Sequence, residues 1–113
     1  MGRRKEVERA PGRRGSGNVF AALGLPSADE LLAKATLASA ITEALTARGL
    51  TQRAAAQLMG IDQPKVSRIL SGRLEEFSTE RLITLLRALG RDILIVVRPT
   101  PKSRKRGRLS VAA

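Results

Sequence analysis

The sequence predicts a mainly α fold, a helix-turn-helix bundle followed by one C-terminal β-strand, and three observations support this prediction. Two short helices joined by a Gly-containing turn occupy residues 50–72. Capped amphipathic segments flank this pair, and an aliphatic run follows at 93–97. The 113 residues have room for one domain, which we place at 18–99. The segments 1–17 and 100–113 contain Gly, Pro and many basic residues without an apolar period, so we expect disordered basic arms.

The first helix of the pair begins after Thr51. The hydroxyl of Thr51 is placed to accept a backbone N–H from the first turn, which makes it an N-cap. Gly60 ends the helix, because glycine enters the left-handed conformation without a steric penalty. Helical spacing predicts one apolar face made of Leu50, Ala54, Ala55, Leu58 and Met59.

The second helix of the pair covers residues 63–71. Asp62 is its expected N-cap, Pro64 is tolerated in a first turn, and Gly72 closes the helix. Its predicted buried stripe consists of Val66, Ile69 and Leu70, and its outer polar face of Gln63, Lys65, Ser67, Arg68 and Ser71. Such residue types contact base edges, since Gln pairs with adenine and Arg with guanine. The alternative interpretation is an ordinary helical hairpin with a solvated polar face.

Two further helices flank the pair. Ser27 and Glu30 predict a capping box at the start of a long helix that ends near Arg48, with Gly49 as its stop. The bundle does not need this length, so we expect the first half to pack outside the core, on a partner. Its apolar positions are Leu31, Leu32, Ala35, Ala38, Ile41, Thr42 and Leu45. Upstream, residues 18–25 are short and apolar and are expected to dock by Val19, Phe20 and Leu23.

The last predicted helix begins after Ser78 and stops at Gly90. Ser78 is its expected N-cap, and the preceding Phe77 is placed to pack against the first turns as a hydrophobic staple. Four leucines at helical spacing predict the face that this helix buries. They are Leu82, Leu85, Leu86 and Leu89.

A run of five aliphatic residues between Gly90 and Pro99 predicts a β-strand at 92–98. A strand needs a hydrogen-bonding partner, and the chain offers no other good strand. We therefore expect the same strand of a second copy to pair with it across a two-fold axis. The dimer contacts would be Ile93, Ile95 and Val97. The alternatives are a strand that lies on its own helices, or a short pairing with residues 18–20.

The net charge of +11 indicates a polyanionic partner, but its distribution matters more than its size. Residues 1–17 carry six basic and two acidic side chains, and residues 99–113 carry five basic and no acidic ones. Most of the excess charge therefore lies in the arms. No run of 18 apolar residues predicts a membrane helix, and the Arg-rich N-terminus lacks the apolar region of a secretory signal. We expect a cytoplasmic, nucleoid-associated protein.

Several of these features together resemble the XRE family of lambda-repressor-like helix-turn-helix regulators. They are the Thr-Gln opening, the small Ala55, the Gly-Ile turn and the Val-Ser-Arg-Ile run. Over residues 18–99 the chain is similar to a branch that contains HigA-like antitoxins. The resemblance implies a five-helix-type DNA-binding domain, a dimerisation strand, repression of a shared operon, and a RelE-like ribosome-dependent RNase toxin as partner.

The resemblance also implies a set of DNA-contacting residues. Gln52 matches a position that meets a phosphate, and Gln63 and Pro64 match the start of the recognition helix. Arg68 matches a base-facing position one turn later. Pro64 departs from the usual polar residue, so direct readout would depend on Gln63 and Arg68. The remaining members of the set are Lys65 and Ser67, beside the base contacts, and Ser71 and Arg73, near the backbone.

The function predicted from the sequence is a dimeric, sequence-specific repressor of transcription that binds double-stranded DNA. One alternative is a protein-interaction module that mainly neutralises a toxin, and another is a non-specific nucleic-acid binder that uses its basic tails. An enzyme is not expected, because the chain has no Cys or His and no defensible nucleophile–base pair. We also expect no metal and no cofactor: Asp62 is better explained as a helix cap, and no phosphate-binding Gly-rich loop occurs.

Overall fold

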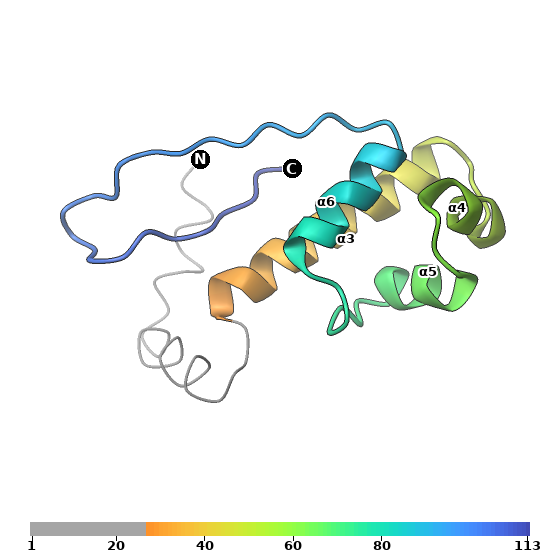
Figure 1. Cartoon of the computed structure of the whole chain (residues 1–113), viewed down its shortest axis with the longest axis horizontal. Helices are drawn as coiled ribbons and strands as arrows, with labels where there is room; N and C mark the ends of the chain where they lie inside the picture. The colour runs from red at the N-terminus through yellow and green to blue at the C-terminus, as the bar shows by residue number, and fades with distance from the viewer. Residues whose placement is uncertain (1–26) are drawn as a thin grey trace.

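The computed structural model describes residues 27–113, and this part of the chain contains four helices. They are α3 (Ala28–Ala47), α4 (Gln52–Met59), α5 (Gln63–Leu70) and α6 (Thr79–Ala88). Helices α3 and α6 lie side by side, and α4 and α5 lie beyond them toward the C-terminal end of α3 (Figure 1). The predicted arm at 1–17, the docking of 18–25 and its pairing with the strand lie outside the described residues.

The helix starts predicted from capping residues are confirmed. Thr51, Asp62 and Ser78 each accept a backbone N–H three residues later, at 3.0, 2.9 and 3.0 Å respectively. Ser27 and Glu30 form the complete capping box. These bonds satisfy amide groups that a helix start leaves without an intrahelical partner, so each boundary is set by its own local sequence.

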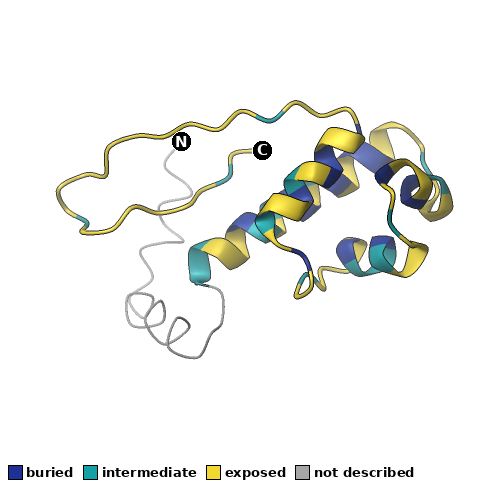
Figure 2. Cartoon of the chain, viewed as in Figure 1, coloured by how far each residue is buried: buried dark blue, intermediate teal, exposed yellow. Residues whose placement is uncertain are grey.

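The core is mainly aliphatic and is shared by all four helices. The leucines of α6 are buried as predicted, and Phe77, which precedes that helix, is only 1% exposed. From α3 the core takes Leu37, Ile41 and Leu45. Figure 2 shows this buried face of α3 and α6 turned toward each other and toward the helix pair. At the far end, Arg48 Nη1 donates to the carbonyl of Leu89 at 3.3 Å and ties α3 to the end of α6.

Part of the predicted apolar pattern is wrong at the edges of the bundle. Leu58 is 41% exposed and its place in the α4 core is taken by Ala56, while Leu70 at the end of α5 is 36% exposed. Leu31 and Leu32 are also exposed, in agreement with the expectation that the first half of this helix lies outside the core. Periodicity predicts which face is apolar, but the neighbouring elements decide how far along the helix that face is covered.

The predicted β-strand at 92–98 is not found, and residues 27–113 contain no strand at all. The segment leaves α6 as a drawn-out chain that runs away from the helix pair (Figure 1). A strand is defined by a ladder of backbone hydrogen bonds to a second strand, and a single copy of this part of the chain supplies no partner. The aliphatic composition therefore correctly indicated an extended segment, but an extended segment forms a sheet only when a second strand pairs with it.

The C-terminal segment turns back after Pro101 and returns toward α3 (Figure 1). Arg104 donates its backbone N–H to the carbonyl of Pro101 at 3.0 Å within the turn. Farther on, the backbone N–H of Leu109 donates to Oδ2 of Asp29 at 2.8 Å, and Val111 packs against the core. Residues 100–113 contain no helix and no strand, yet they follow a path that the start of α3 holds in place.

Candidate nucleic-acid interface

Helices α4 and α5 are joined by a short turn whose backbone is set by Gly60. Gly60 has φ 71°, in the left-handed region that glycine enters without penalty, and the following Ile61 N–H donates to the carbonyl of Ala56 at 3.0 Å. Ala55 of α4 and Val66 of α5 are completely buried where the two helices meet. This packing holds the two helices in a fixed relation, which is the basis of a helix-turn-helix.

The first residues of the two helices converge on one open depression. Its lining is made by Gln52 at the start of α4, and by Gln63, Pro64 and Ser67 of α5. Gln52, Gln63 and Pro64 are exposed and Ser67 is half-buried, so their polar atoms are within reach of a ligand. The structure thus brings together four of the eight residues predicted to contact DNA, from two different helices.

Lys65 has an ion-pair partner that the sequence analysis did not predict. Its Nζ lies 3.3 Å from Oδ2 of Asp62, the N-cap of its own helix, and the side chain is only partly exposed. The backbone N–H of Lys65 lowers the pKa of the Asp62 carboxyl, with a further lowering from the Lys65 ammonium. Lys65 therefore stabilises the cap of α5 in the isolated protein, and a phosphate contact would require it to release that pair.

Arg68 also has a partner that the sequence did not reveal. Its Nε lies 2.8 Å from Oε1 of Glu76, and its Nη2 donates to Oε2 at 3.4 Å. Nε is almost completely covered from solvent, and its N–H is not aligned for a hydrogen bond with any described acceptor. Arg68 is half-buried, in contrast to Val66 and Ile69 of the same helix, which are buried.

Ser71 and Arg73 form a small polar cluster at the C-terminal end of α5. The Ser71 hydroxyl donates to the carbonyl of Arg68 at 3.2 Å, and Arg73 Nε donates to the Ser71 oxygen at 3.3 Å. The backbone N–H of Arg73 donates to the same Arg68 carbonyl at 2.8 Å across Gly72, which has φ 80°. Both side chains remain exposed, at the opposite end of α5 from the depression.

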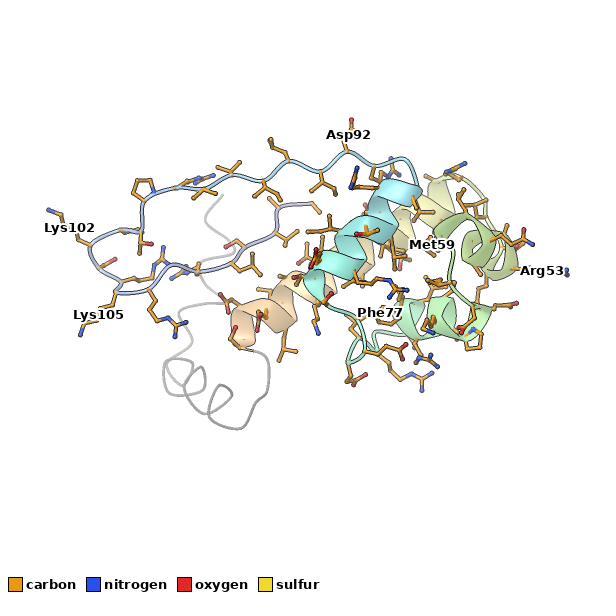
Figure 3. The ribbon with its side chains drawn as sticks, in the orientation of Figure 1. Arg53, Met59, Phe77, Asp92, Lys102 and Lys105 are labelled. Atoms are coloured by element: carbon orange, nitrogen blue, oxygen red, sulfur yellow. The ribbon has the colours of Figure 1, made fainter. Side chains whose placement is uncertain are left out.

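Two exposed charged residues beside this surface were missed by the sequence analysis. Glu76 lies in the loop between α5 and α6, and Arg53 projects from the exposed side of α4 (Figure 3). Arg53 follows the predicted contact Gln52 directly, which was a usable signal. Glu76 had no such signal, because its approach to Arg68 depends on how the loop turns after α5.

The three residues predicted as dimer contacts do not share one environment. Ile93 is half-buried and packs against the protein's own core, whereas Ile95 is 74% exposed and Val97 is 91% exposed. The neighbouring Leu94 and Val96 are also exposed. The segment therefore presents uncovered apolar side chains on more than one side.

The described residues offer little else that suggests chemistry. Between Ser27 and Ala113 no group of three or more acidic side chains is gathered closely enough to hold a metal ion. In the same region no helix combines the length and the apolar character needed to span a bilayer. The exposed surface of α4 and α5 is thus the main candidate site.

The fold and this surface together define a helix-turn-helix protein. Comparison with known proteins identifies the family to which it belongs. A family model described as a helix-turn-helix domain matches residues 19–98. A solved structure described as an XRE family transcriptional regulator matches with a TM-score of 0.71 and 48% sequence identity, over 78% of this chain and 99% of that chain. No match was found among curated proteins. The chain therefore belongs to this helix-turn-helix domain family, and its fold is of the XRE type.

Proposed function

We propose that this protein is a DNA-binding transcriptional regulator that places α5 in the major groove of its operator. The observation that supports this most directly is the convergence of Gln52 with Gln63, Pro64 and Ser67 on one open surface. Helix α5 is exposed at its polar N-terminal residues and packs against α4 across a Gly-containing turn. This arrangement matches the docking geometry of helix-turn-helix proteins. The XRE regulator at 48% identity supports the same function.

In this proposal, the start of α4 contacts the DNA backbone. The exposed Gln52 is the first residue of α4, next to backbone N–H groups that the helix leaves without intrahelical partners. Helix N-termini favour phosphate because these N–H groups and the helix dipole both attract negative charge. Such contacts fix the position of the protein on the duplex without selecting a sequence.

Sequence choice would come from α5. Gln63 is suited to bidentate pairing with adenine and Arg68 with guanine, while Pro64 offers an apolar contact to a thymine methyl group. Ser67 lines the same depression as Gln63 and Pro64. Ser71 and Arg73, at the C-terminal end of α5, would make a second contact to the DNA backbone.

We further propose that two copies act together as a repressor. Leu94, Ile95, Val96 and Val97 are all more than half exposed, which leaves a contiguous apolar stretch uncovered. Antiparallel pairing with the same segment of a second copy would cover these side chains and join the two backbones by hydrogen bonds. The two α5 helices should then lie about 34 Å apart on a two-fold-symmetric operator.

A second candidate function is the neutralisation of a RelE-like toxin, as in an antitoxin. The observation that favours it is the exposed apolar start of α3, where Leu31 is 46% and Leu32 38% exposed. Such a surface suits a protein partner better than it suits solvent. Co-purification of the chain with a small RNase encoded beside its gene would support this function, and it is compatible with repression.

The test is a fluorescence-anisotropy titration of the full chain against the promoter region upstream of its own gene, at two salt concentrations. A saturable, sequence-selective complex that Arg68→Ala weakens would support operator recognition. A second variant, with Lys102, Lys105 and Arg106 changed to Gln, measures how much the charges of the C-terminal tail contribute to the affinity for DNA. Binding that ignored sequence and followed only these tail charges would contradict the proposal and favour non-specific binding by the tails.

A further inference from the structure

The loop that carries Glu76 is a tight turn with both ends held in the core. The backbone N–H of Phe77 donates to the carbonyl of Leu74 at 3.0 Å, so that Glu75 and Glu76 occupy the two central positions. Phe77 is 1% exposed, and Leu74 packs against the core from the other end. The position of the Glu76 backbone is therefore determined by the fold and does not depend on the contact with Arg68.

Glu76 contacts one particular edge of the Arg68 guanidinium. A guanidinium has five N–H donors, one on Nε and two on each Nη. The carboxylate takes the edge formed by Nε and Nη2, with contacts of 2.8 and 3.4 Å. This leaves both N–H groups of Nη1 and one of Nη2, and one N–H from each of these nitrogens forms the end-on fork that matches O6 and N7 of guanine.

The negative charge of Glu76 opposes DNA binding unless it is paired with a cation. A negative charge beside the helix proposed to contact DNA repels phosphate, and an ion pair with side chains 33% and 40% exposed contributes only modestly to folding stability. Pairing with Arg68 removes much of this repulsion. It also restricts a long side chain that would otherwise lose its rotational freedom on binding.

We propose that Glu76 is a positioning residue for base recognition: it holds the Nε edge of Arg68 so that the opposite edge faces a guanine in the major groove. This inference rests on the proposed function and adds a specificity determinant from outside the recognition helix. It predicts that the ion pair persists in the DNA complex.

The experiment compares Glu76→Gln with Glu75→Gln in the full chain. Both variants remove one negative charge from the same turn, and within residues 27–113 Glu75 forms no ion pair, so it is the matched control. The measurement is the ratio of affinities for the operator and for operators with single G·C pairs replaced, at one fixed salt concentration. Wild type must first show a selective operator complex.

We expect Glu75→Gln to tighten binding to all sequences similarly and to leave the affinity ratio unchanged. Glu76→Gln should lower the ratio by about three- to tenfold, and only at the guanine that Arg68 contacts, because the arginine is no longer held before binding. In the Arg68→Ala background, Glu76→Gln should have no further effect on the ratio. In the free protein, hydrogen exchange at Arg68 Nη2, which donates to Glu76, should become faster in Glu76→Gln.

Two results would overturn the inference, and they differ from failure of the proposed function. If Glu76→Gln matched Glu75→Gln at every base pair, the ion pair would be only a surface contact. If Glu76→Gln instead raised the ratio, Glu76 would be withholding Arg68 from DNA. Absence of any selective complex with wild type would contradict operator recognition itself, and the positioning role with it.

Discussion

At the scale of single residues, the candidate site is defined by what each polar side chain contacts before any ligand arrives. Lys65 forms an ion pair with Asp62, and Arg68 forms one with Glu76. Gln52 and Gln63 are uncharged, so they have no ion pair to break before they contact a ligand. The two glutamines are therefore ready for DNA, and the two basic residues act through an existing partner. This difference determines how their variants should behave.

Arg68→Ala should weaken operator binding by about 1–3 kcal/mol and relax preference at one base position. The reason is the loss of a bidentate contact, which leaves other positions unaffected. Titration against a panel of single-base operator variants measures both effects. Arg87→Ala, which removes the same charge from the exposed side of α6, is the control. A uniform loss across the panel in Arg68→Ala would rule out base recognition by this side chain.

At the scale of the elements, the turn between α4 and α5 depends on a left-handed residue. A Cβ at Gly60 would meet no atom within 4 Å, so Gly60→Ala tests backbone conformation without steric overlap. We expect a loss of about 1–2 kcal/mol in the free energy of unfolding, because φ 71° is costly for alanine. Urea denaturation measures it, with Gln57→Ala on the exposed face of α4 as control. An unchanged midpoint would mean that the turn tolerates another conformation.

The return of the C-terminal segment depends on Asp29 near the start of α3. Burial alone would raise the pKa of this carboxyl, but the hydrogen bonds donated by the Leu109 N–H and the Ser27 hydroxyl outweigh it, and the pKa is lowered. Because the folded-state pKa lies below the unfolded one, the stabilisation is complete above the unfolded value. It is lost as the pH falls through the lower folded value.

We therefore expect the amide resonance of Leu109 to move with the titration of Asp29 in an NMR pH series, at a pKa below the usual aspartate range. Asp29→Asn should abolish this movement and speed up hydrogen exchange at Leu109. Asp92→Asn, an exposed aspartate in the same chain, should change neither observation. A Leu109 amide that did not respond below pH 4 would show that the contact does not hold the tail.

At the scale of the whole molecule, basic residues lie at the two ends and an exposed apolar stretch lies between them. The helix pair with Arg53 lies at one end, and the tip of the C-terminal segment with Lys102 and Lys105 lies at the other (Figure 3). Between them runs the uncovered stretch Leu94–Val97. An exposed aliphatic segment tends to associate with another chain, and a second copy is always available.

Ile95→Lys should therefore convert a dimer into a monomer, because a buried charge in the paired segment would lack a partner. Sedimentation-velocity ultracentrifugation measures the assembly state directly. Thr84→Lys, on the exposed face of α6, adds the same charge elsewhere and should leave the dimer intact. A dimeric Ile95→Lys variant would show that the copies do not associate through this segment.

The sequence alone predicted all four described helices and their caps, because capping contacts join residues three positions apart. Ser27, Thr51, Asp62 and Ser78 each needed only their own helix to be interpreted correctly. Helical spacing likewise placed Gln63 and Ser67 on the outer face of α5, whereas the roles of Pro64 and Gln52 were implied only by the resemblance to a known family. The structure brings these four residues together on one surface, which was not predicted.

Only the tertiary structure decided which long-range contacts the exposed residues make. The pairing of Arg68 with Glu76 depends on a turn anchored in the core, and the contact between Asp29 and Leu109 joins residues 80 positions apart. The aliphatic run at 92–98 predicted a strand that one copy does not form, because a strand requires backbone partners from another segment. Helices are determined by neighbours in sequence, whereas ion pairs, sheets and docked tails are determined by neighbours in space.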